Sequence, residues 1–287
     1  MKPNLKFYSE EYASDAVNQI LTMGGYSGFD NLTDETRDAI RLVMDTVDMQ
    51  DSDIYKSGKY GDLLKDGSGY KMAANEEPDI TGAIKTASQV ADALILQYYE
   101  EPDVKKASFG HDLSQSDWAE IGGLLTKYAE IKYGAPLVSV NMSHPLIREL
   151  YDEIKNEKRK FSFLCAHDVT VYTTLSALRV KPYTLPDSIE TKTPIGVKLL
   201  FERWRDSDGK AWYRVDLVYR STEQIRNSEV LSLDNPPMRY NLSFEGVPTN
   251  EDGLIAEADL FDLFDRTLAE YDELLSRYTE EALDEAA

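Results

Sequence analysis

An apolar run that ends abruptly in a His-Asp pair constrains the fold of this chain more than any other feature. Residues 161–166 are apolar and rich in aromatic side chains, which is typical of a buried β-strand. From Val169 onward apolar residues recur at helical spacing, so we predict that a strand over 161–166 passes into a helix at His167 and Asp168. Free backbone N–H groups and the positive end of the helix dipole favour an anion at such a helix N-terminus. A base that can hydrogen-bond an anion and an acid that can release a proton therefore stand side by side.

Composition limits the classes of partner. The chain has 287 residues, of which 42% are hydrophobic, so it can bury a substantial core in one domain or two. A formal net charge of −21 makes nucleic acid and anionic membranes poor partners, because binding to a phosphate backbone needs clustered Lys and Arg. The charge does not exclude one phosphate group bound in a locally positive pocket. No apolar run reaches membrane-spanning length, and residues 1–8 show no pattern of an export signal.

Helical periodicity dominates the first half of the chain. The ranges expected to be helical are 9–22, 40–47, 79–100 and 116–132. Gly24-Gly25 is expected to end the first of these helices, and Asp79 to cap the third. A further helix is predicted to open at Ser143-His144-Pro145, with the proline in its first turn.

The second half changes to strand patterns after the helix that begins near Val169. Two β-rich runs over 195–204 and 211–219 flank an Asp-Gly turn at 206–209, which predicts a hairpin. Ser221 and Gln224 have the spacing of a capping box for a short helix. The C-terminal helix carries one apolar stripe, which favours packing on its own domain over a self-association face.

The remaining chemically active side chains have simpler interpretations. His111, followed by Asp112, lies in an expected loop and is interpreted as structural or solvated, whereas His144 before Pro145 is interpreted as a helix cap. Cys165 is the only cysteine and is expected to be a small buried hydrophobe. Three histidines and one cysteine far apart give no metal-ligand spacing, and no glycine-rich phosphate loop is present, so neither a metal nor a cofactor is expected.

An ordered set of motifs resembles the histidine acid phosphatases, nearest to the bacterial glucose-1-phosphatase and phytase group. The motifs are His167-Asp168 after the apolar run, Thr193-Pro-Ile-Gly196, Phe201-Glu-Arg-Trp204 and Glu223-Gln-Ile-Arg226. The resemblance covers about residues 79–264 and implies an α/β fold, a three-layer phosphoglycerate-mutase-like sandwich with a helical cap domain. Residues 1–132 would form the mainly helical cap region, and 133–287 the C-terminal part of the α/β phosphatase domain.

The resemblance also implies a reaction, the hydrolysis of a small phosphate ester through a phosphohistidine. His167 would bind the phosphoryl group, and Asp168 would protonate the leaving oxygen, which lowers the barrier for a poor alkoxide leaving group. We expect Asp168 to be partly buried beside the bound phosphate. Sugar or inositol phosphates are the substrates that the resemblance suggests. Thr170 either places a hydroxyl near the anion or caps the helix.

One departure from the family pattern is serious. The family's nucleophile lies in an Arg-His-Gly-x-Arg-x-Pro motif, but the histidines of this sequence follow Gly110, Ser143 and Ala166. By family order the sequence corresponds to a C-terminal portion, and we expect it to be inactive alone. Its partner would be a missing N-terminal segment or a second copy of the chain. The alternative is a catalytically dead remnant or a phosphate-binding module.

Two further points stay open from the sequence. The family has Gly where this chain has Ala166, which matters little if the backbone φ there is negative. The cellular compartment is also undecided, because full-length relatives are periplasmic or secreted whereas no export signal is recognised in this sequence.

Overall fold

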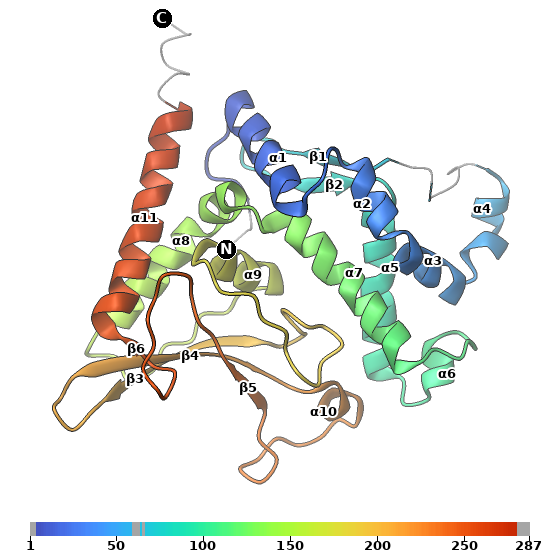
Figure 1. The fold of residues 1–287 in the computed structure, drawn as a ribbon. Helices are drawn as coiled ribbons and strands as arrows, with labels where there is room; N and C mark the ends of the chain where they lie inside the picture. Colours follow the sequence, from blue (N-terminus) through green and yellow to red (C-terminus); the bar gives the residue numbers. More distant parts are fainter. Residues whose placement is uncertain (1–3, 59–63, 65–66, 280–287) are drawn as a thin grey trace, which may run out of the picture.

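The computed structural model describes residues 4–58, 64 and 67–279 (Figure 1). Its helices are α1 (Glu10–Gly24), α2 (Asp30–Glu35), α3 (Arg37–Thr46), η1 (Met49–Asp51), α4 (Asp53–Lys56), α5 (Ala83–Glu100), α6 (Val104–Ala107), α7 (Gln115–Tyr133), α8 (Pro136–Lys155), α9 (Asp168–Ala177), α10 (Thr222–Arg226) and α11 (Glu257–Thr279). Its strands are β1 (Gly69–Lys71), β2 (Asp79–Thr81), β3 (Lys198–Arg205), β4 (Ala211–Tyr219), β5 (Met238–Asn241) and β6 (Ile255–Ala256).

The strands form two antiparallel sheets. β1 pairs with β2, while β3, β4 and β5 lie in that order and β6 pairs with β4. In Figure 1 helices α8, α9 and α11 lie on one side of the larger sheet, and α2 to α7 form a helical part beside them. The layout is a sheet layer, a helix layer packed on it and a helical region next to both.

The first helix follows its local sequence signals. Ser9 has extended backbone geometry, and its side chain accepts a hydrogen bond from the N–H of Tyr12, as expected of an N-cap. Gly25 ends α1 with a left-handed φ of 68°, a conformation that glycine adopts without steric cost. The predicted end at Gly24-Gly25 is confirmed.

The hairpin of β3 and β4 is also confirmed. Its register pairs Lys198 with Val218 and Arg205 with Ala211, and Gly209 in the connecting turn has a φ of 80°. Ser221 and Gln224 form the expected capping box at α10. These elements depend on turn and cap residues a few positions apart, so the sequence alone predicts them.

The predicted start of the helix at Ser143 is wrong. α8 begins at Pro136, which occupies the first turn, and runs through Pro145 to Lys155 without interruption. Proline costs a helix interior one backbone hydrogen bond. Here the apolar face continues on both sides of it, with Val138 and Ile147 completely buried, and this packing keeps the helix in one piece.

The expected cap at Asp79 is wrong as well. Asp79 lies in β2, and its carboxylate accepts a hydrogen bond from Lys85 Nζ at 2.5 Å. α5 starts later, at Ala83, after Gly82 with a φ of 92°. The chain therefore turns from a short strand into the helix at a glycine instead of extending the helix back to the acid.

One hydrophobic core runs through the described residues. Leu5 and Phe7, near the start of the chain, are buried, and the ring of Phe7 lies 5.7 Å from that of Tyr271 on α11. Segments far apart in sequence are thus packed together. The division into regions 1–132 and 133–287 remains a prediction.

Candidate functional site

His167 and Asp168 lie at the N-terminus of α9, as the sequence predicts. His167 is the N-cap residue with extended backbone geometry, and its N–H donates to Thr170 Oγ1 at 3.2 Å. Thr170 is therefore a capping residue. Asp168 is the first helical residue, and both members of the pair are exposed. The partial burial expected for Asp168 is not observed.

The start of α9 leaves donors for an anion. Within the described residues no hydrogen bond occupies the backbone N–H groups of Asp168 and Val169. Unpaired N–H groups at the positive end of a helix dipole attract phosphate and carboxylate groups. The helix N-terminus therefore offers two backbone donors next to the exposed side chain of His167.

The predicted strand before the pair is not present, which corrects the sequence prediction for 161–166. These residues have no regular secondary structure, and Phe161 and Phe163 are 79% and 69% exposed. Cys165 is exposed too, and so is not the buried hydrophobe that we expected. The physical reason is the lack of a pairing partner: no described strand pairs with 161–166, so their backbone groups cannot join a sheet.

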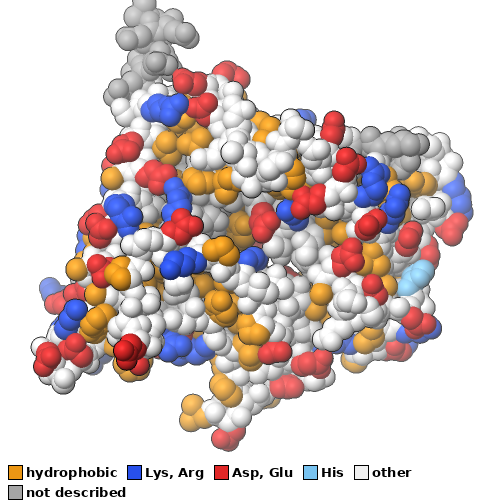
Figure 2. Space-filling model, viewed as in Figure 1, with side chains coloured by type: hydrophobic (Ala, Val, Ile, Leu, Met, Phe, Trp, Pro, Cys, Tyr) orange, Lys and Arg blue, Asp and Glu red, His pale blue; other side chains and the backbone are white. Residues whose placement is uncertain are grey.

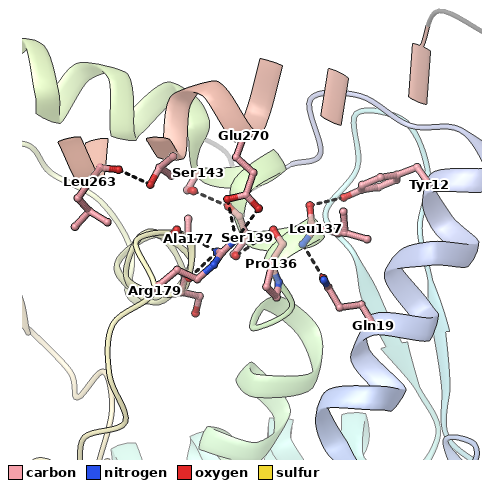
Figure 3. A network of polar contacts seen from close by, with 12 residues as sticks. Tyr12, Gln19, Pro136, Leu137, Ser139, Ser143, Ala177, Arg179, Leu263 and Glu270 are labelled. Atoms are coloured by element: carbon pink, nitrogen blue, oxygen red, sulfur yellow. Dashed lines mark hydrogen bonds and ion pairs between the residues drawn. The ribbon is translucent and has the colours of Figure 1, made fainter. Parts of the chain in front are cut away.

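Arg179 anchors the C-terminal end of α9. Arg179, which follows the helix with a left-handed φ of 56°, donates to the carbonyls of Ser176 and Ala177. Its other nitrogen binds both carboxylate oxygens of Glu270 on α11, at 2.6 and 2.8 Å (Figure 3). A cation at the negative end of the dipole stabilises the helix, and the bidentate pair ties it to α11. No local pattern of residues predicts this anchor.

Carboxyl groups from two other elements lie near Asp168. Burial raises the pKa of Glu190, whose carboxylate accepts hydrogen bonds from the Tyr99 hydroxyl at 2.8 Å and the Ile195 N–H at 3.2 Å. Burial also raises the pKa of Asp92 on α5, and the negative charge of Asp168 raises it further. Asp92 and Glu190 are residues of the site region that sequence reasoning missed.

Glu190 also fixes the loop that leads from the helical layer to the sheet. The Val197 N–H donates to the Pro194 carbonyl at 3.0 Å, and Gly196 in this turn has a φ of 72°. Because Ile195 donates to Glu190, the Thr193–Gly196 motif is tied to a carboxylate whose pKa the charge of Asp168 raises.

The other two histidines lie elsewhere. His111 lies in the loop between α6 and α7, and its Nε2 is 3.1 Å from Asp48 Oδ1. This contact agrees with the structural interpretation made from the sequence. His144 is not a helix cap: it lies inside α8, its ring stacks on Tyr271 at 3.6 Å, and its Nε2 is 3.1 Å from Arg148. Neither histidine is placed with His167.

The described residues show neither a metal-binding cluster nor a membrane-spanning helix. No group of three or more His, Cys, Asp or Glu side chains there is placed to hold a metal ion. None of the described helices is long and apolar enough to cross a membrane. Figure 2 shows acidic side chains spread over the visible face, with lysines and arginines scattered among them.

The geometry supports part of a phosphate-ester chemistry. The first N–H groups of α9 can donate to phosphoryl oxygens, and the exposed side chains of His167 and Asp168 lie at the same helix end. The other histidines, His111 and His144, lie before α7 and inside α8. Ala166 is not among the described residues with positive φ, so alanine replaces the family's glycine without strain.

Comparison with known proteins identifies the relatives. No family model matches the chain. Glucose-1-phosphatase of Providencia rettgeri is 31% identical over 75% of this chain and 53% of that enzyme. Glucose-1-phosphatase of Salmonella typhimurium is 30% identical over 78% of this chain and 55% of that enzyme. Phytase AppA of Escherichia coli is 27% identical over 58% of this chain and 40% of that enzyme. The chain spans about half the length of the two glucose-1-phosphatases.

Solved structures show the same fold. Hafnia alvei phytase matches with a TM-score of 0.77 at 18% identity, over 89% of this chain and 65% of that one. Citrobacter braakii phytase matches with a TM-score of 0.78, over 92% of this chain and 67% of that one. The predicted α/β fold with a helical region is confirmed by these matches. The chain is therefore a homologue of the glucose-1-phosphatases and phytases of the histidine acid phosphatase family, over about half of their length.

Proposed function

We propose that residues 1–287 form the acid-bearing part of a phosphomonoesterase that works through a phosphohistidine. His167 and the N-terminus of α9 bind the phosphoryl group, and Asp168 protonates the leaving oxygen. The nucleophilic histidine comes from a polypeptide segment that carries Arg-His-Gly-x-Arg-x-Pro. The observation that carries this proposal is the His167-Asp168 pair at a helix N-terminus whose first N–H groups are unoccupied.

The proposed reaction balances in two steps. The incoming histidine nitrogen attacks phosphorus, the bond to the ester oxygen breaks, and Asp168 gives its proton to that oxygen. Water then attacks phosphorus while Asp168 takes a proton from it, and the phosphorus–nitrogen bond breaks, which releases phosphate and restores both the histidine and the protonated Asp168. Asp168 suits the first step because it is exposed at the helix start, where an ester oxygen can reach it. The names of the relatives support sugar or inositol phosphates as substrates.

Reconstitution tests this proposal. Purified 1–287 is mixed with, or fused behind, the N-terminal segment of the Providencia rettgeri glucose-1-phosphatase, and release of phosphate from an alkyl phosphate ester is followed. We expect no turnover by 1–287 alone and turnover by the completed protein. On this alkyl ester Asp168→Asn should lower turnover by about 10²–10⁴-fold. Asp112→Asn is a matched control, because His111-Asp112 is the other His-Asp pair and its acid binds Lys105 in an exposed loop.

Three outcomes decide between the alternatives. Turnover by 1–287 alone that depends on Asp168 would refute the requirement for a supplied nucleophile. Equal loss in the Asp168→Asn and Asp112→Asn proteins would refute the role of Asp168. Phosphate binding by 1–287 that depends on His167, with no turnover after completion, would favour the phosphate-binding module instead.

A further inference from the structure

A cavity of about 400 Å³ lies along the half of α9 farther from His167. Its walls come from the end of α1, the last turns of α7, the start of α8, α9 itself and the segment 179–183. Ligand pockets in proteins have volumes of about 300–1,000 Å³. The cavity is therefore large enough for a small organic molecule, and none of its lining residues has a role in the reaction proposed above.

The walls combine apolar and cationic side chains. Ile20, Leu175 and Val180 supply apolar surface, and Tyr172 lines the cavity from α9. The charged lining residues are Lys127, Glu130, Arg179, Lys181, Lys192 and Glu245. Four cations thus face two carboxylates, in a protein whose formal net charge is −21. The excess of positive charge is local to this cavity.

Two of the four cations already have strong partners. Lys127 Nζ is 2.9 Å from a Glu35 carboxylate oxygen, and Arg179 is held by both oxygens of Glu270. These two groups are ion-paired without any ligand. The positive charge that is left for a ligand belongs to the two lysines, of which Lys181 is exposed and Lys192 is half-buried.

Lys192 is the unusual member of the set. Its ammonium donates to the backbone carbonyl of Tyr183 and lies 4.6 Å from the centroid of that ring, while the Tyr183 hydroxyl donates to the Lys192 carbonyl at 3.0 Å. None of the ion pairs between described residues includes Lys192, and the only charge that acts on its pKa is that of Glu130, which raises it by less than burial lowers it. Burial lowers its pKa, which reflects the cost of keeping the charge out of water. An anion bound beside it would offset that cost.

We propose that this cavity binds a small amphipathic anion. The apolar body of the ligand would lie against Ile20, Leu175 and Val180, and its anionic group would pair with Lys192. The two hydrogen bonds between Tyr183 and Lys192 preorganise the ammonium group before the ligand binds, so little side-chain freedom is lost on binding.

Anilinonaphthalenesulfonate, an aromatic anion, is the probe, and phenylnaphthylamine is its uncharged counterpart. Titration of purified 1–287 is followed by probe fluorescence. Lys192→Met should weaken binding of the anion about tenfold or more and leave binding of the uncharged probe within about twofold. Lys198→Met is the matched control, because Lys198 also donates to a backbone carbonyl but is exposed outside the cavity. Equal affinities of the two lysine variants for the anion would overturn the proposal.

A second variant separates this site from exposed apolar surface. Ser176→Trp places a bulky ring in the cavity and should abolish binding of the anion, with the melting temperature as a check on folding. Binding that persists in this variant would place the probe elsewhere. If Ser176→Trp does not fold, magnetization transfer in the wild-type protein from the aromatic protons of the probe to the Met23 methyl group replaces it, and its absence would refute the site.

Discussion

Truncating Phe163 tests the largest difference between the sequence prediction and the structure. The side chain is 69% exposed, so about a third of the roughly 200 Å² that a phenylalanine can bury, about 60 Å², is removed from water. At about 25 cal/mol per Å² this area contributes about 1.5 kcal/mol. The figure is an upper limit, because unfolded chains also bury part of their apolar surface. Phe163→Ala should therefore reduce the free energy of unfolding by less than about 1.5 kcal/mol.

Phe244 provides the comparison. It is completely buried, and truncation of such a residue costs about 3–5 kcal/mol. Both variants are measured by urea denaturation followed by tryptophan fluorescence, at two protein concentrations. The reasoning is refuted if Phe163→Ala costs as much as Phe244→Ala at both. An equal cost at the high concentration alone would mean that a second copy covers 161–166. After completion with the nucleophile-bearing segment, we expect the cost of Phe163→Ala to rise.

Two further predictions concern stability. Asp216 is fully buried between Arg214 and Arg239, whose nitrogens lie 2.9 and 2.8 Å from its carboxylate. Asp216→Asn should lower the free energy of unfolding, measured by urea denaturation, by about 2 kcal/mol. The loss is smaller than for a fully buried ion pair because both arginines are partly exposed. Burial first and Arg148 second lower the pKa of His144 from its ordinary 6.5, so the unfolded chain binds a proton more readily. The free energy of unfolding should therefore fall as pH drops below about 7 and through the lowered pKa, and His144→Gln should remove this part of the pH dependence; a wild-type loss that is unchanged in the variant would contradict the assignment.

Local signals explain what the sequence could predict. The cap at Ser9, the hairpin around Gly209 and the capping box at Ser221 each depend on residues within a few positions of one another. The placement of His167 and Asp168 at a helix start follows from the change of apolar spacing at Val169. Such signals act through backbone geometry, so they hold whatever packs around them.

Longer-range contacts explain what the sequence could not predict. The apolar run at 161–166 has the composition of a buried strand, but a strand needs a neighbour to pair with, and no described strand pairs with this segment. Tyr99 and Glu190 are 91 positions apart, as are Arg179 and Glu270, and no periodicity connects such pairs. The continuation of α8 through Pro145 likewise depends on the packing of its buried face, which overrides the local cost of proline.

The role of Asp168 as the acid that protonates the leaving oxygen is the central claim, and the leaving group tests it most directly. In the completed protein, kcat/KM is measured for wild type and Asp168→Asn with an alkyl phosphate, whose alkoxide needs the proton, and with a nitrophenyl phosphate, whose anion leaves without it. We predict that the variant loses about 10²–10⁴-fold on the alkyl ester and far less on the nitrophenyl ester. Equal losses on both esters would contradict the account.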